Sequence, residues 1–246
     1  MRRVTEQPLV DGMPLRFSLL RVPFFLEPDY PRSEEFEETN LERLRRKWGG
    51  VQQFEEQKKR HGLKERGREV GIENFVARRI ASNTWASHRM VQWVTRTLGV
   101  SAAERLYAAL NFTHFEQGAK LNDREMLVTA AVEHAGADEA AAREFLQSDE
   151  GSAEIAAALA MLREMGINSI PTFLIDGKYM LSGAAHADEF VRLFRDMEKE
   201  EAKRLVAAGE NAHADDEFAE GAFLFSDALR IPREMLLEEL DLAQHA

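Results

Sequence analysis

The chain contains no cysteine among its 246 residues. Because a thiolate is the group that attacks a disulfide, the side chains of this chain cannot carry out thiol–disulfide exchange. Cysteine-ligated metal sites are excluded as well. The seven histidines are scattered, and none has the close spacing of a zinc motif: His61, His88, His114, His134, His186, His213 and His245. We therefore expect no metal site and no bound cofactor.

Long apolar runs and an excess of basic charge are also missing. No stretch of about 18 apolar residues occurs, so we expect no transmembrane helix. Residues 1–8 carry basic side chains but no apolar core of a signal peptide, which leads us to expect a cytoplasmic location. Lysine and arginine number 32 against 43 aspartate and glutamate, a formal net charge of −11. This balance argues against nucleic-acid and acidic-membrane partners.

Familiar catalytic motifs are absent too. The sequence has no G-x-S-x-G elbow, no phosphate-binding G-x-x-x-x-G-K-[ST] loop and no G-x-G-x-x-G after a strand. Motif spacing alone therefore assigns no catalytic residue. With 44% hydrophobic and 30% charged residues, the composition is that of an ordinary globular protein.

Hydrophobic patterning predicts an early strand followed by helices. Residues 15–25 are apolar and rich in aromatic residues, which is typical of a strand. A helical pattern then runs from residue 33 to 165. Within it we expect three helix starts. Ser82 or Asn83 caps the first, and Asn122 caps the second in a capping box with Glu125. Asp138 caps the third.

The pattern changes again after Gly166. Residues 171–175 and 178–182 are expected to be paired strands, because Asp176-Gly177 between them is a strong hairpin signal. An amphipathic helix is expected over 187–197. A strand, a helical block, a hairpin and a helix predict an α/β domain with a helical insertion. We divide the chain into a sheet domain (1–33 and 166–199), a helical insertion (34–165) and an acidic extension (200–246).

Two segments are strongly charged. Residues 57–68 are basic, and we interpret them as a solvated surface rather than a nucleic-acid patch. The segment from Glu200 to Asp241 contains twelve acidic residues but only four Lys or Arg. This extension also contains the apolar cluster 223–225 and an expected last helix after Pro232. It is either an acidic linker whose last helix docks on the domain or a segment that binds a partner.

One segment supports a more specific interpretation. Residues 166–184, GINSIPTFLIDGKYMLSGA, resemble the cis-proline loop and terminal hairpin of the DsbA-like thioredoxin-fold family, in its FrnE-type branch. Residues 21–31 resemble the family's second strand and its exit, and residues 83–89, NTWASHR, resemble a helix of its helical insertion. Residues 115–123 resemble a later turn of the insertion. The order and spacing of these segments are the main evidence for the resemblance, which covers residues 15–197.

The resemblance implies a substrate site. Pro171 would be cis, and Ile170 would offer its N–H and C=O to an extended peptide. Pro171 could also be a trans proline that starts a strand. The implied substrate-binding residues are Ser169, Ile170, Pro171, Thr172, Asn83, Thr84 and His88. For the last three, a structural role is an equally good interpretation.

The chain departs from the family at its start. Redox members carry C-x-x-C at the start of the first helix, after the first strand, and residues 1–12 are too short for that unit. Without the first strand, the sheet has a gap of about 10 Å between the second strand and the hairpin. We favour the view that the chain is an incomplete version of a longer oxidoreductase. Two alternatives are that residues 15–25 pair directly with 173–175, and that another segment or another chain fills the gap.

The expected fold is thus α/β, an incomplete thioredoxin-like sheet with a large helical insertion. The family activity is protein dithiol–disulfide oxidoreduction, which this chain alone is expected not to perform. One alternative is a redox-inactive protein that binds peptides or a small thiol such as glutathione. A second is a protein that docks a partner through its acidic extension.

Overall fold

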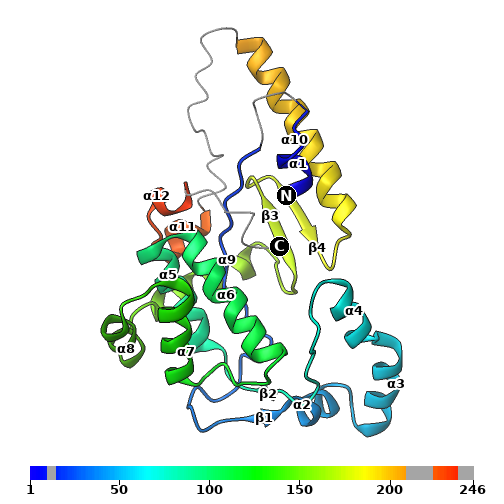
Figure 1. Cartoon of the computed structure of the whole chain (residues 1–246), viewed down its shortest axis with the longest axis vertical. Helices are drawn as coiled ribbons and strands as arrows, with labels where there is room; N and C mark the ends of the chain where they lie inside the picture. The colour runs from blue at the N-terminus through cyan, green and yellow to red at the C-terminus, as the bar shows by residue number, and fades with distance from the viewer. Residues whose placement is uncertain (10–14, 209–223, 238–246) are drawn as a thin grey trace. The chain divides into compact units, whose positions relative to one another are not determined.

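The computed structural model describes residues 1–9, 15–208 and 224–237. The chain forms two compact units, one of Met1–Phe24 with Ala153–Ala246 and one of Phe25–Ser152 (Figure 1). The first unit contains the hairpin, and the second contains the main hydrophobic core.

The first half of the Phe25–Ser152 unit is built from short elements. These are β1 (Glu38–Thr39), α2 (Asn40–Lys47), α3 (Val51–His61), α4 (Leu63–Glu69) and β2 (Ile80–Ala81). Strands β1 and β2 pair antiparallel. Helix α2 begins with a capping box, in which the Thr39 hydroxyl accepts from the Glu42 N–H at 3.2 Å and the Glu42 carboxylate accepts from the Thr39 N–H at 3.0 Å.

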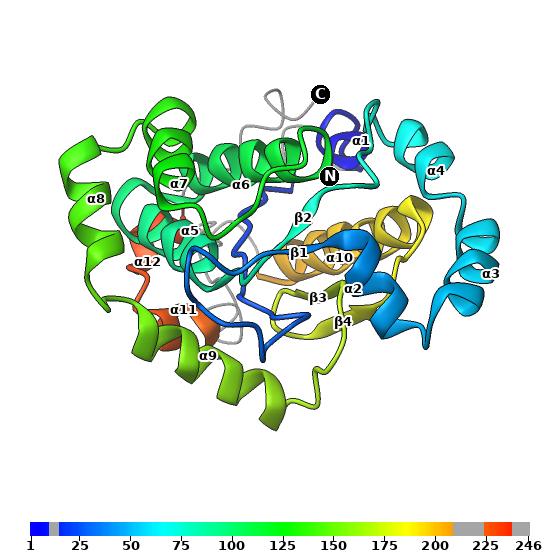
Figure 2. The same cartoon turned by 90° about the horizontal axis from the view of Figure 1, so that it is seen from below.

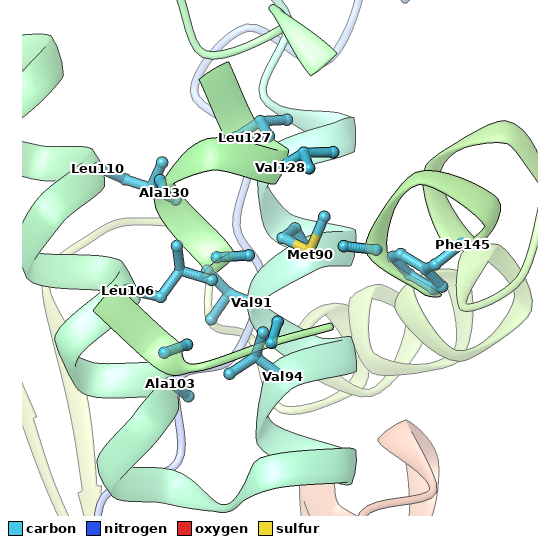
Figure 3. Packing of buried hydrophobic residues seen from close by; sticks show 14 of the residues in the cluster. Met90, Val91, Val94, Ala103, Leu106, Leu110, Leu127, Val128, Ala130 and Phe145 are labelled. Atoms are coloured by element: carbon cyan, nitrogen blue, oxygen red, sulfur yellow. The ribbon is translucent and has the colours of Figure 1, made fainter. Parts of the chain in front are cut away.

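The second half of this unit is helical and contains the core. Its elements are α5 (Trp85–Leu98), α6 (Val100–Phe115), α7 (Arg124–Ala130), a π-helical turn (Ala131–Ala135) and α8 (Glu139–Gln147). Met90, Val94, Leu106 and Leu127 are fully buried and interlock across α5, α6 and α7 (Figure 3). Such close packing makes this cluster the main apolar contribution to the stability of the unit.

The caps of two of these helices test the sequence expectations. Asp138 caps α8 as predicted, since its carboxylate accepts from the Ala141 N–H at 2.9 Å. The prediction that Asn122 caps the next helix was wrong, because Asp123 does so by accepting from the Met126 N–H at 3.0 Å. The side-chain amide of the buried Asn122 instead donates to the carbonyls of Ser33 and Phe36 in an earlier loop. A carboxylate has no N–H and could not form these bonds.

The other unit contains the hairpin. Its elements are α1 (Arg2–Thr5), α9 (Ser152–Glu164, starting at the boundary), β3 (Thr172–Ile175), β4 (Tyr179–Ser182), α10 (Ala187–Ala208), α11 (Leu224–Leu229) and α12 (Arg233–Leu236). Strands β3 and β4 form the predicted hairpin. Asp176 and Gly177 have φ of 53° and 64°. Both are left-handed, as a tight two-residue turn between right-twisted strands requires.

Helix α10 packs on this hairpin. Phe190 contacts Phe173 of β3, with ring centroids 4.9 Å apart, and both views show α10 alongside the two strands (Figures 1 and 2). The helix starts at Ala187 as predicted but continues to Ala208 instead of ending at residue 197.

The predicted strand at residues 15–25 does not form. These residues have no regular secondary structure, although Phe17 packs edge-on against Phe194 at 4.9 Å. In the described chain, β3 pairs with β4 alone, so direct pairing of 15–25 with 173–175 is also wrong. An apolar segment without a neighbouring strand has no partners for a ladder of hydrogen bonds and packs through its side chains instead.

The C-terminal helices account for part of the acidic extension. Pro232 directly precedes α12, close to the predicted start, and Phe225, Leu229 and Leu236 are buried. Arg230 also contacts Glu154 of α9 at 3.4 Å. Phe223, the first residue of the expected apolar cluster, lies outside the described residues. No described helix has the length and apolar character to cross a bilayer.

Candidate functional site

The loop before β3 has the predicted conformation. The Ile170–Pro171 peptide bond is cis. The Thr172 hydroxyl donates to the Ser169 carbonyl at 2.9 Å, and the Gly183 N–H donates to the Pro171 carbonyl at 2.8 Å. The loop is therefore closed on itself and tied to the end of β4.

Ile170 presents an open surface at this loop. Its side chain is 47% exposed. Within the described residues, neither its N–H nor its C=O forms a hydrogen bond. Such an exposed, unpaired backbone is a template for an added strand.

The hairpin around this loop is only partly covered. Phe173 and Met180 are 37% and 47% exposed. Lys178 pairs with Asp176 at 3.0 Å, and the Tyr179 hydroxyl donates to Glu200 at 3.1 Å, which raises the pKa of Tyr179. The register of the hairpin places Phe173 and Met180 on opposite faces, while the charged groups lie at its turn end.

Asn83 is buried and uses both ends of its carboxamide. Its oxygen accepts from the Trp85 N–H at 2.7 Å, and its amide donates to the Tyr30 carbonyl. The prediction that Ser82 or Asn83 caps α5 was wrong, because the N-cap is Thr84, which forms no side-chain cap bond. The bonds of Asn83 to Trp85 and Tyr30 assign it a positioning role for the start of α5.

Thr84 and His88 are partly buried and lie one helical turn apart, joined by the His88 N–H to Thr84 carbonyl bond of 3.0 Å. The His88 ring stands edge-on to Phe25 at 4.9 Å. Phe25 also stacks on Trp85 at 5.3 Å, and the guanidinium of Arg32 lies 3.5 Å from the Trp85 ring centroid.

The sequence analysis missed this aromatic cluster of Phe25, Arg32, Trp85 and His88. The sequence did contain one indication of this cluster, because Trp85 directly follows the predicted site residues Asn83 and Thr84. Its partners Phe25 and Arg32 lie more than fifty residues earlier, and no local pattern relates them to Trp85.

Arg89, next to His88, has a structural role. Its guanidinium donates to the carbonyls of Phe145, Ser148 and Glu150 at 3.1, 2.8 and 2.8 Å. Burial lowers its pKa, but these carbonyls compensate for the lost water. Arg89 thereby closes the C-terminal end of α8.

The predicted site residues thus fall into two groups, one in each compact unit. Ser169, Ile170, Pro171 and Thr172 form a continuous, exposed loop, and Asn83, Thr84 and His88 start α5. Within the described ranges, no three acidic or histidine side chains are placed to hold a metal ion.

Comparisons with known proteins agree with this geometry. The family model of the DSBA-like thioredoxin domain matches residues 21–195. A crystal structure of a probable DsbA oxidoreductase from Streptomyces coelicolor has a TM-score of 0.58 at 23% identity, over 78% of this chain and 76% of that one. No curated protein matches. The α/β thioredoxin-like fold with a helical insertion is confirmed, and the chain belongs to the DSBA-like thioredoxin domain family.

Proposed function

We propose that this chain binds extended segments of protein substrates at residues 169–172, as the scaffold of a DsbA-type dithiol–disulfide oxidoreductase. Family membership supports a protein substrate. The chain itself does not exchange disulfides, because it has no cysteine to form the mixed-disulfide intermediate. Thiols needed for turnover would come from outside these 246 residues.

The observation that carries this proposal is the unpaired backbone of Ile170. In the described chain its donor and acceptor are both unused, and its side chain is 47% exposed. An extended peptide would add its own N–H and C=O there, and its apolar side chains would contact the exposed side chain of Ile170. Strand addition explains how one site accepts many sequences, because the main chain supplies the affinity.

Thr84 and His88 are a separate candidate site for substrate contact, at the start of α5 in the Phe25–Ser152 unit. Asn83 acts through Trp85 and Tyr30, so we assign it to positioning. Replacing His88 with Gln tests the contact, because a purely structural His88 would change stability without changing peptide affinity.

The binding experiment uses fluorescence anisotropy with a labelled, unfolded, cysteine-free peptide. We expect saturable binding by the full chain and loss of binding when the peptide backbone is N-methylated at alternate residues. N-methylation removes the N–H groups used in strand pairing and leaves the protein unchanged. Equal affinity for both peptides would refute strand addition.

A protein variant gives a second test. Ile170→Ala should weaken peptide binding, whereas Val70→Ala, which trims a side chain that is 74% exposed in the other unit, should not. In an insulin-reduction assay the chain should remain at background. Saturable binding of glutathione without peptide binding would favour the small-thiol alternative over this proposal.

A further inference from the structure

Arg32 lies in a loop whose backbone is held on both sides. Before it, the Tyr30 carbonyl accepts from the side-chain amide of Asn83. After it, the Ser33 carbonyl accepts from the side-chain amide of Asn122 at 2.9 Å. Asn83 and Asn122 are both buried, so these bonds are shielded from competing water. The position of the Arg32 backbone is therefore restrained.

The indole ring of Trp85 is restrained as well. Its Nε1–H donates to the Ser152 hydroxyl at 3.3 Å, and that hydroxyl donates to the Asp149 carboxylate at 2.6 Å. Phe25 stacks on the ring, with centroids 5.3 Å apart. An aromatic side chain has few rotatable bonds, so a hydrogen bond and a stacked ring restrict it strongly. Trp85 thus offers a stable aromatic surface.

The guanidinium of Arg32 lies flat on this surface. Its Cζ is 3.5 Å from the ring centroid of Trp85. At that separation the guanidinium plane is close to parallel with the ring, because a steep tilt would push one nitrogen inside van der Waals contact. A stacked guanidinium uses its face for the contact with the ring. Its N–H bonds lie in its own plane, so they point outward along the ring surface and are still able to donate.

These donors are unused within the described residues. Arg32 is exposed, and it forms no hydrogen bond or ion pair there. An exposed arginine without a partner is common, since water hydrates it. Arg32 differs because its guanidinium is already immobilised on Trp85. A ligand that pairs with it therefore loses less side-chain entropy than one that pairs with a freely moving arginine.

The acidic residues that follow Arg32 have other partners. Glu34 accepts from the Arg124 N–H at 2.8 Å, and its carboxylate also lies 3.6 Å from the Arg124 guanidinium. Glu35 accepts from the hydroxyl of Ser33. Neither carboxylate pairs with Arg32, although the chain has a formal net charge of −11. The charge of Arg32 is thus not neutralised by any partner in the described parts of the chain.

We propose that Arg32, held flat on Trp85, binds a carboxylate of a peptide ligand, either an acidic side chain or a free C-terminus. The edge of one guanidinium matches the two oxygens of one carboxylate. A phosphate would leave further oxygens without a donor at a single arginine. The proposal concerns the Phe25–Ser152 unit and does not depend on strand addition at Ile170 in the other unit.

NMR titration of the full chain tests the site through its own signals, the Nε–H of Arg32 and the indole Nε1–H of Trp85. The probe is a short glycine-rich peptide, blocked at both ends, that contains a single glutamate. Its control has glutamine in place of that glutamate, and a further peptide has glutamine and a free C-terminus. We expect saturable shifts with at least one of the carboxylate peptides and none with the control. The peptide that binds identifies the source of the carboxylate, and Ile170→Ala should leave the shifts unchanged.

Variants separate the stacked fork from general charge, with the Trp85 signal as the readout. Arg32→Gln should weaken carboxylate binding by about tenfold or more, since a charge-assisted contact is lost. Arg32→Lys keeps the charge without the planar fork and should recover only part of the affinity. Arg78→Gln removes the same charge from another exposed position of this unit and should leave binding unchanged.

Two sets of results would overturn the proposal. On the unmodified chain, these are the absence of saturable shifts with both carboxylate peptides, or equal shifts with the blocked glutamine peptide. Among the variants, they are equal losses in Arg32→Gln and Arg78→Gln, or full affinity in Arg32→Lys. The peptide comparison needs no substitution, so it decides the matter if a variant fails to fold.

Discussion

The hydroxyl of Thr172 donates a hydrogen bond to the carbonyl of Ser169, closing the loop that contains Ile170 and Pro171. This internal hydrogen bond restrains the conformation of the proposed peptide-binding loop. Thr172→Val keeps the side-chain shape and removes the donor. We expect peptide affinity to fall about two- to tenfold, the equivalent of one neutral hydrogen bond.

Anisotropy titration of the Thr172→Val variant measures that loss. Ser182→Ala is the matched control, because Thr172 also lies 3.4 Å from the Ser182 hydroxyl. If both variants lose the same affinity, the bond across the strands matters and the bond to Ser169 does not.

Arg89→Met should destabilise the helical unit by about 2–4 kcal/mol, because three carbonyls at the end of α8 lose their donor. Urea denaturation followed by circular dichroism measures the free energy of unfolding. Arg143→Met, in a surface ion pair with Glu125 and Glu139, should cost less than about 1 kcal/mol. A loss of similar size in the two variants would show that the carbonyls of α8 find water instead.

Leu106→Ala should cost about 2–5 kcal/mol of unfolding free energy, because Leu106 is fully buried in the cluster of α5, α6 and α7 and leaves a cavity. Leu98→Ala removes the same atoms from a side chain that is 38% exposed, so its effect should be much smaller. Thermal melts rank the two, and an equal shift in melting temperature would argue against the core assigned here.

Stability should fall in acid partly through Glu27. Burial raises the pKa of Glu27, but its bond to Lys47 and its attraction to Arg43 outweigh that effect, and the net pKa lies below the usual 4.5. A depressed folded-state pKa stabilises the protein above the unfolded value and loses that contribution as the pH falls through the folded value.

Urea unfolding between pH 3 and 7 measures this contribution. Glu27→Gln should be less stable than the unmodified chain at pH 7, and the difference should shrink below about pH 4.5. Glu73→Gln, at an exposed position in the same compact unit, is a control with the same charge change. A constant difference across the whole range would show that folding does not change the pKa of Glu27.

Much of the local structure followed from short-range patterns. The hairpin was predicted because Asp176 and Gly177 adopt left-handed backbone at little cost, and that preference belongs to the residues themselves. The start of α8 was predicted for a similar reason, since the Asp138 side chain reaches the N–H of a residue three positions on.

Features that depend on distant residues were missed or wrong. Residues 15–25 have the composition of a strand, yet in the described chain no other strand lies beside them. The stacking of Phe25 on Trp85 joins residues sixty positions apart, and the partners of Arg79 come from the segments around Phe75 and Phe115. Neither cluster has a local spacing to reveal it.

The sequence by itself determined the absence of thiol chemistry in this chain, the family resemblance and the elements whose caps and turns are local. Tertiary structure decided which polar groups form hydrogen bonds within the described residues and which do not. Asn83 is occupied by two backbone partners, whereas the backbone of Ile170 has none among the described residues. That difference depends on atoms brought together by folding, because a hydrogen bond is decided by distance and angle in space, not by separation along the chain.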